Sequence, residues 1–172
     1  MLEVKDLNIA FPGAEGPITV SDKISFEIKP GESLCLVGES GCGKTMAALG
    51  IMGLIPGSAS VSGRIAFKGK DLLSMRENDI RKIRGRDISM IFEQPGTCLN
   101  PVFTVGEQIA EIFKIRQKCS GKESKNKAVE LMRKVGIDTP EKRFRYYPHE
   151  FSGGMAQRVM IAMALAFSPS LL

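Results

Sequence analysis

The sequence predicts an α/β protein in which a phosphate-binding loop joins a buried strand to a helix. Residues 33–37 (SLCLV) form a short apolar run between two glycines, which is typical of a buried parallel strand. A helix-forming segment (KTMAALGIMGL) begins at Lys44 and ends near Pro56. The octapeptide between them fits the pattern G-x-x-x-x-G-K-[ST]; it consists of Gly38, Glu39, Ser40, Gly41, Cys42, Gly43, Lys44 and Thr45.

The chemistry of this octapeptide follows from its residue types. Glycines at 38, 41 and 43 let the backbone bend tightly, so that N–H groups point into a common hollow and hold phosphate oxygens. The helix that begins here adds the positive end of its dipole. Lys44 is expected to reach the β- and γ-phosphates, and the Thr45 hydroxyl is expected to hold Mg²⁺. The alternative interpretation is a glycine-rich turn that caps an ordinary helix.

Bulk composition indicates one globular domain with an ordinary core. The chain has 172 residues, of which 43% are hydrophobic and 25% are charged. No apolar run has transmembrane length, and the N-terminus carries acidic residues where a signal peptide is apolar. The net charge of +5 comes largely from residues 114–134, which favours a solvated basic face. The four cysteines lack C-x-x-C spacing and are interpreted as reduced thiols.

Strand patterns fill the N-terminal third. Residues 2–11 alternate between apolar and polar with one slip in phase, which predicts a strand with a bulge. A turn at 12–17 leads into a second alternating segment that ends at Ile28, and residues 64–68 form a third. These segments predict antiparallel strands beside a parallel core, to which the apolar run 88–92 (ISMIF) contributes another buried strand.

Helix signals dominate the rest of the chain. Ser74 with Glu77, and Thr104 with Glu107, have the spacing of capping boxes. The first opens a short helix to about Arg84, and the second precedes an apolar face at positions 109, 112 and 113. Another apolar face at 128–135 ends at Gly136, and Pro140 marks a further helix start.

A second glycine motif precedes the last helix. Ser152 is a suitable N-cap for a helix that extends to about Phe167, and Gly153 and Gly154 let the backbone approach another group closely. This is again a helix N-terminus built to meet an anion. One chain rarely needs two such sites for one triphosphate, so this site is expected to face the γ-phosphate held by a second copy of the fold.

With both motifs in place, the sequence resembles the ATP-binding subunit of an ABC transporter, along essentially its whole length. The stretches 147–155 (YPHEFSGGM), 89–92 (SMIF) and 99–108 (LNPVFTVGEQ) are most similar to the dipeptide, oligopeptide and nickel importer branch. The resemblance implies a P-loop NTPase of ABC type. It divides the chain into a β subdomain with the P-loop core (1–92), a Q-loop and helical subdomain (93–154) and a signature helix that returns to the core (155–172).

The resemblance also implies roles for individual residues. Phe11 takes the position of an aromatic residue that stacks on adenine, although a core-facing strand residue is the alternative. Glu93 takes the position of the Q-loop glutamine, which contacts Mg²⁺ and the attacking water, and Gln94 follows it, so the two polar residues are exchanged relative to the branch. Lys44, Glu93 and Gln94 make up the implied catalytic set, and Thr45 and Glu93 the metal ligands. Ser152, Gly153 and Gly154 would grip the γ-phosphate bound to a partner subunit, whereas His149 is interpreted as structural.

Cofactors and partners follow from the same resemblance. ATP and Mg²⁺ are the implied cofactors, and membrane permease subunits and a second ATP-binding subunit are the implied partners. The expected location is the cytoplasmic face of the membrane, without a signal peptide or spanning segment. No nucleic acid partner is expected.

The chain ends at Leu172, before the position of the family's Walker B strand and catalytic glutamate. We therefore expect an incomplete core sheet and almost no ATP hydrolysis by these residues alone. Three alternatives remain open at this point: an ABC ATPase that acts on nucleic acid or ribosomes, a GTPase or kinase with the same loop, and a fragment that binds without turnover. The sequence has no N-K-x-D guanine motif, which argues against a GTPase.

Overall fold

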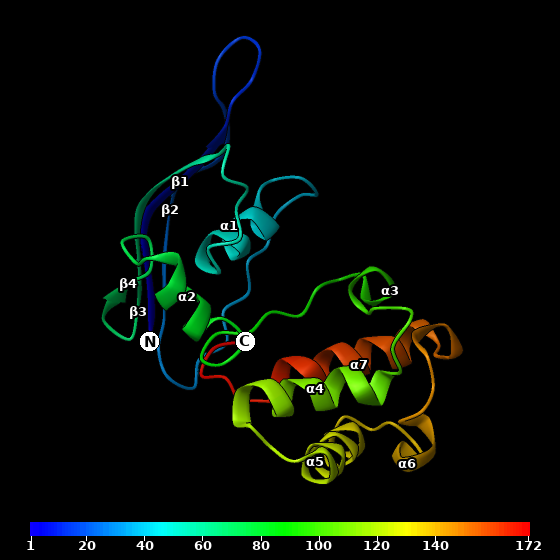
Figure 1. Ribbon diagram of the computed structural model, residues 1–172. Coiled ribbons are helices and arrows are strands. Elements are labelled where there is room, and N and C mark those ends of the chain that lie inside the picture. Colours follow the sequence, from blue (N-terminus) through cyan, green and yellow to red (C-terminus); the bar gives the residue numbers. More distant parts are fainter. The chain divides into compact units, whose positions relative to one another are not determined.

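The computed structural model describes the backbone of residues 1–172 and every side chain except the one at position 116 (Figure 1). The chain folds as two units, Met1–Lys82 and Ile83–Leu172, and each is described here by itself. The three segments expected from the sequence (1–92, 93–154 and 155–172) remain a prediction.

An antiparallel sheet forms the frame of the first unit. It contains β1 (Leu2–Phe11), β2 (Ile18–Ile28), β3 (Ser60–Phe67) and β4 (Lys70–Asp71) in the order β2-β1-β3-β4. Figure 1 shows β1 and β2 as a long ribbon joined by the predicted turn. The predicted irregularity in β1 is confirmed, because its register with β2 shifts between Val4 and Leu7, and Asp6 has a φ of 47°.

One face of this sheet is covered by α1 (Lys44–Ile51). The inward side chains of β1, at Leu2, Val4, Leu7 and Ile9, are almost completely buried. A β-carbon at Gly50 would lie 3.2 Å from Ile9 Cδ1, so the helix backbone sits directly on the strand. The sheet and α1 therefore share a small hydrophobic core that fixes where the helix begins.

The two buried parallel strands expected from the apolar runs do not form. Residues 33–37 belong to neither a helix nor a strand, and Leu34, Leu36 and Val37 are 45%, 42% and 90% exposed. The run at 88–92 makes only isolated bridges, from Ile88 to Arg84 and to Leu171. The reason is that no strand in the described part of the chain pairs with residues 33–37, and an unpaired backbone does not become a strand on apolar character alone. The core sheet is therefore incomplete, as expected.

One helix prediction also needs correction. The helix that begins at Lys44 ends at Ile51 rather than near Pro56, since Gly53 takes a left-handed φ of 62° and its N–H donates to the Gly50 carbonyl at 3.0 Å. The short helix predicted after Ser74 is α2, which covers Glu77–Ile83, and the Ser74 hydroxyl before it donates to the Asp71 carbonyl at 2.9 Å.

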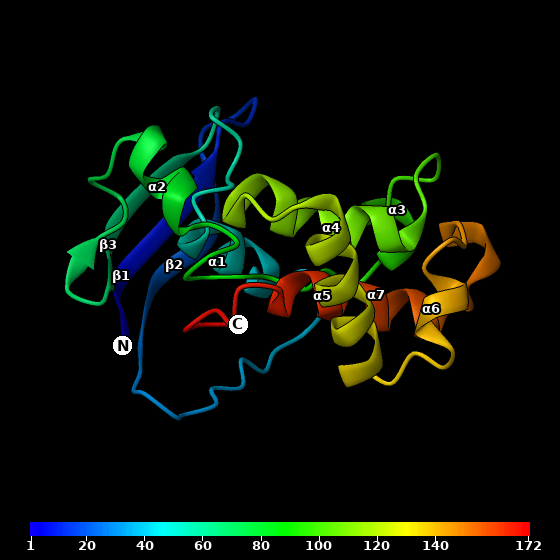
Figure 2. The same cartoon turned by 60° about the horizontal axis from the view of Figure 1, so that its bottom comes forward.

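The second unit is helical. It contains α3 (Pro95–Cys98), α4 (Val105–Gln117), α5 (Gly121–Lys134), α6 (Pro140–Arg143), a 3-10 turn (Pro148–Glu150) and α7 (Gly153–Leu165). In Figure 2, α4 and α5 lie across α7, and these helices contact one another. Their shared core includes Val105, Ile109, Ala128, Met132, Val159 and Ala162.

The predicted helix ends in this unit are confirmed. Thr104 and Glu107 form a complete capping box at the start of α4. Ser152 caps α7, and α5 stops before Gly136, which has a φ of 76°. The positions of these ends matter for function, because both the start of α7 and the end of α5 border the hollow described below.

Candidate functional site

The glycine loop, residues 38–45, leads directly into α1. Gly41 and Gly43 have φ values of 83° and 92°, a region that disfavours any other residue. Gly43 is the N-cap of α1, and no side chain caps this helix end. Within the described residues, the backbone N–H groups of Lys44, Thr45 and Met46 have no hydrogen-bond partner. These donors and the helix dipole create an anion-binding position at the start of α1.

Lys44 folds back over this loop. Its Nζ donates to the Gly38 carbonyl at 2.8 Å and to the Glu39 carbonyl at 2.5 Å, and lies 3.4 Å from Cys42 Sγ. No carboxylate pairs with Lys44 in the part of the chain that the structure describes. The positive charge is therefore held over the glycine loop without being neutralised, which suits a polyphosphate.

The glycine loop packs against the strand β2. A β-carbon at Gly43 would overlap the carbonyl oxygen of Val20 and would lie 3.2 Å from Ser21 Oγ. Ser21 is 4% exposed, and its hydroxyl has no hydrogen-bond partner among the described residues. The loop therefore rests on the β2 backbone at a point where only glycine fits.

Phe11 lies near this contact. It is the last residue of β1 and pairs with Ile18, which is two residues from Val20, or about 7 Å along the strand. Its side chain is half-buried. The sheet therefore brings the proposed aromatic contact and the glycine loop to the same end of β1 and β2, which the sequence alone did not establish.

The proposed metal ligands lie in different units. Thr45 is exposed in the first turn of α1, whereas Glu93 and Gln94 precede α3, for which Gln94 is the N-cap. Thr45 belongs to the first unit and Glu93 to the second, so their joint role as metal ligands stays a prediction. The described residues contain no cluster of three or more His, Cys, Asp or Glu side chains suited to a metal ion. A cation held by one hydroxyl and phosphate oxygens, in the manner typical of Mg²⁺, fits this sparse donor set.

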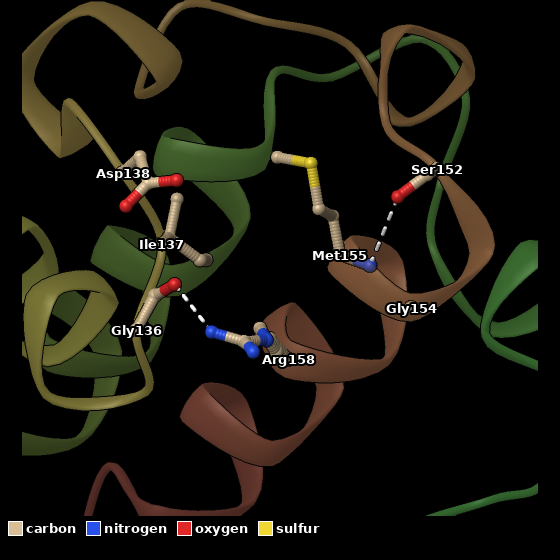
Figure 3. A pocket seen from close by; sticks show the side chains of 7 residues that line it. All are labelled: Gly136, Ile137, Asp138, Ser152, Gly154, Met155 and Arg158. Atoms are coloured by element: carbon tan, nitrogen blue, oxygen red, sulfur yellow. Dashed lines mark hydrogen bonds between the residues drawn. The ribbon is translucent and has the colours of Figure 1, made fainter.

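The start of α7 forms a second position with exposed backbone donors. Ser152 Oγ accepts from the N–H of Met155 at 3.4 Å, while Ser152, Gly153 and Gly154 are all exposed. This helix start borders a hollow of about 320 Å³. Figure 3 shows the hollow with Gly136, Asp138 and Arg158, which also line it. Ser152, Gly153 and Gly154 are the residues predicted from the sequence. Arg158 was given no role there, although it is a charged residue in an otherwise apolar helix.

A buried glutamine organises the loop before α4. Gln108 is 8% exposed, and its side chain accepts from Asn100 N at 2.9 Å and donates to the carbonyls of Asn100 and Phe103 at 2.9 and 3.0 Å. The loop that it holds presents Val102 and Phe103, which are 71% and 53% exposed. The sequence analysis missed Gln108, whose signal was a polar residue on the apolar face of α4.

Glu107 anchors the same helix start electrostatically. Hydrogen bonds from the Thr104 hydroxyl at 2.7 Å and the Thr104 N–H at 3.0 Å hold the pKa of the Glu107 carboxyl below its usual value, against a smaller opposing effect of burial. A carboxylate in the first turn also complements the dipole of α4.

A glycine loop that opens a helix beside a sheet, with a second glycine-rich helix start in a helical unit, is typical of the P-loop class of nucleoside-triphosphate-binding proteins. The chain belongs to the ABC transporter family, whose model matches residues 21–172. The family predicted from the sequence is thereby confirmed.

Two relatives and one solved structure illustrate the similarity. The chain is 49% identical to the probable peptide ABC transporter ATP-binding protein y4tR of Sinorhizobium fredii, covering 100% of this chain and 52% of the relative. It is 48% identical to the oligopeptide transport ATP-binding protein OppD of Bacillus subtilis, covering 100% and 49%. The dimeric ATP-binding cassette MJ0796 bound to ADP and Pi superposes with a TM-score of 0.83 at 29% identity, covering 98% of this chain and 71% of that one.

The chain spans about half the length, or less, of the curated relatives that it matches. In its described part, none of the helices is both long and apolar enough to span a bilayer.

Proposed function

We propose that this chain binds MgATP through the glycine loop and serves as an energy-coupling subunit of an ABC importer. The observation that carries the proposal is the start of α1, where the free N–H groups of residues 44–46 meet the unneutralised Lys44. Preorganised donors of this kind stabilise phosphate charge without having to reorganise.

Each residue of the loop has a distinct task in this proposal. The loop N–H groups hold the β-phosphate, and Lys44 exchanges its carbonyl partners at Gly38 and Glu39 for the β- and γ-phosphates. The Thr45 hydroxyl and the Glu93 carboxylate would hold Mg²⁺, which when bound neutralises charge on the phosphates. Phe11 would orient the nucleotide by stacking on its base.

The start of α7 completes a site in a second subunit. Ser152, Gly153 and Gly154 would donate to the γ-phosphate of ATP held by the loop of a partner ATP-binding subunit. Closure of two such subunits around two ATP molecules would then drive the membrane permease, and hydrolysis would reset it. The likeness to a dimeric cassette supports this arrangement.

The names of the relatives support peptides as the transported class, since they are peptide and oligopeptide transport ATP-binding proteins. In this proposal the chain attaches to permease subunits at the inner face of the membrane, and the exposed Val102 and Phe103 are part of the contact. No nucleic acid takes part.

The test is equilibrium binding and turnover of ATP by the purified chain beside Lys44→Ala. Loss of one charge-assisted hydrogen-bond donor corresponds to about 1.5–3 kcal/mol, so we expect affinity to fall about 10- to 100-fold. Lys29→Ala is the control, because Lys29 is an exposed lysine of the same unit whose Nζ lies 3.3 Å from the Glu27 carboxylate. We also expect negligible turnover by these 172 residues alone. Unchanged affinity in Lys44→Ala would contradict the proposed site, and Lys44-dependent turnover would contradict the expected inactivity.

A further inference from the structure

A single arginine links the end of α5 to the start of α7. Arg158 Nη1 donates to the carbonyl oxygens of Val135, at 3.3 Å, and of Gly136, as Figure 3 shows for the second bond. Val135 is the C-cap of α5, so these carbonyls belong to the negative end of that helix. The guanidinium therefore both satisfies free carbonyl groups and complements the helix dipole.

The guanidinium of Arg158 packs against a glycine, Gly136. Gly136 has a φ of 76°, and a β-carbon at this position would overlap Arg158 Nη1. Any other residue would be strained and would displace the guanidinium. The absence of a side chain at Gly136 therefore leaves the space that the Arg158 guanidinium occupies at the end of α5.

The charge of Arg158 is not used in an ion pair. Within the described residues no carboxylate pairs with it, although Asp138 lines the same hollow. Arg158 lies six residues after the N-cap Ser152, which corresponds to about 9 Å along the helix axis. Its two bonds to α5 therefore fix the helix behind the exposed N–H groups of Gly153 and Gly154 and leave those groups free.

We propose that Arg158 is a positioning residue for the second phosphate site. By fastening α7 to the end of α5, it holds Ser152, Gly153 and Gly154 in the orientation that grips ATP bound to a second copy of the subunit. This inference rests on the proposed function of the α7 start. It predicts that Arg158 affects pairing of subunits on ATP but not binding of ATP to the chain's own loop.

The experiment compares Arg158→Gln, Arg158→Lys and the control Arg145→Gln, an exposed arginine of the same unit. Binding of a fluorescent ATP analogue reports on the glycine loop, and sedimentation with ATP reports on pairing. We expect all variants to bind the analogue as wild type does. Pairing should weaken at least about tenfold in Arg158→Gln, since each lost hydrogen bond to a charged group corresponds to about 1.5–3 kcal/mol, and Arg158→Lys should restore part of it.

Hydrogen exchange separates failure of this inference from failure of the proposed function. Arg158→Gln should speed exchange of the Met155 and Ala156 amides, which donate to Ser152, while those in the middle of α4 stay protected. If wild type pairs on ATP and Arg158→Gln pairs equally well, the inference is wrong. If wild type does not pair, the role proposed for the α7 start is wrong, and hydrogen exchange then tests the role of Arg158 by itself. Loss of protection confined to the start of α7 in Arg158→Gln would support a positioning role. Unchanged protection, or loss of protection throughout the unit, would overturn that role.

Discussion

The backbone of Gly43 lies directly against the carbonyl group of Val20, so that a β-carbon at position 43 would overlap that oxygen. This contact joins the glycine loop to β2 and, through the pairing of β2 with β1, to the end of the sheet where Phe11 lies. Gly43 therefore both bends the loop and brings its backbone into contact with β2.

Gly43→Ala is expected to lower ATP affinity about 5- to 150-fold. The substituted residue would have to keep a φ of 92° and would displace the loop from Val20, and strain of this kind costs about 1–3 kcal/mol. Titration with a fluorescent ATP analogue measures the change. Gly57→Ala is the control, because nothing lies within 4 Å of its β-carbon position. Equal ATP affinities of the two variants would show that the contact of Gly43 with Val20 does not determine the shape of the site.

Phe11→Ala separates the two interpretations of this aromatic residue. If Phe11 stacks on adenine, affinity for ATP should fall about 3- to 10-fold, consistent with about 0.5–1.5 kcal/mol for an aromatic pair, while affinity for inorganic tripolyphosphate stays the same. Calorimetric titration with both ligands measures this. Phe26→Ala, another half-buried phenylalanine that pairs with Val4 further along the sheet, should affect neither ligand selectively. Equal losses for both ligands in Phe11→Ala would favour a purely structural role.

Glu93→Gln is expected to change the coupling of ATP hydrolysis to transport in the assembled transporter and to leave ATP affinity unchanged. An ionised carboxylate binds Mg²⁺ well but cannot donate a hydrogen bond to water, whereas an amide can. The measurement is the ratio of substrate-stimulated to basal ATPase activity in membranes. The exchange Glu93→Gln with Gln94→Glu tests whether the order of the two residues matters. An unchanged ratio in both variants would rule out this role for Glu93.

The capping box of α4 predicts a pH dependence. The pKa of Glu107 in the folded protein is lowered from 4.5 by its bonds to Thr104, so its contribution to stability is complete above pH 4.5 and is lost as the pH falls through the lower folded value. The free energy of unfolding of Glu107→Gln should therefore lie below wild type at about pH 6 and approach it at about pH 3. Glu111→Gln, which removes a carboxylate from an exposed position of the same helix, is the control. Denaturant titrations at both pH values provide the comparison.

Gln108→Leu is expected to destabilise the second unit by about 1–3 kcal/mol, because it leaves backbone groups of Asn100 and Phe103 without partners. Denaturant unfolding measures the loss. Gln117→Leu is the exposed comparison, which removes a surface hydrogen bond from Lys127 at 2.8 Å. Since Gln108 holds the loop that presents Val102 and Phe103, co-purification with permease subunits should weaken as well. Normal co-purification by a destabilised Gln108→Leu would place the permease contact elsewhere.

The sequence predicted best those features that are set by residues close together in the chain. The β1 bulge, the Thr104–Glu107 capping box and the Ser152 cap are set by residues within a few positions of one another, and all are confirmed. The run at 33–37 was predicted to be a strand because it is apolar, but a strand also needs a neighbour, and pairing is not encoded within five residues.

The same distinction applies to the candidate sites. The glycine loop and the start of α7 were visible as contiguous motifs. The contacts of Gly43 with Val20, and of Arg158 with Gly136, join positions more than twenty residues apart, so no spacing rule revealed them. Roles for Phe11, Glu93 and Ser152 came from resemblance to a family and stay predictions.

The two ends of the glycine loop are held in different ways. Its outgoing end is fixed by α1 and β2, whereas its incoming end follows the unpaired and exposed residues 33–37 and is held by Lys44, whose Nζ donates to the carbonyls of Gly38 and Glu39. In the proposed site Lys44 gives up these two bonds when it turns to the phosphates. The same side chain would therefore hold the loop in shape when no nucleotide is bound and hold the phosphates when one is.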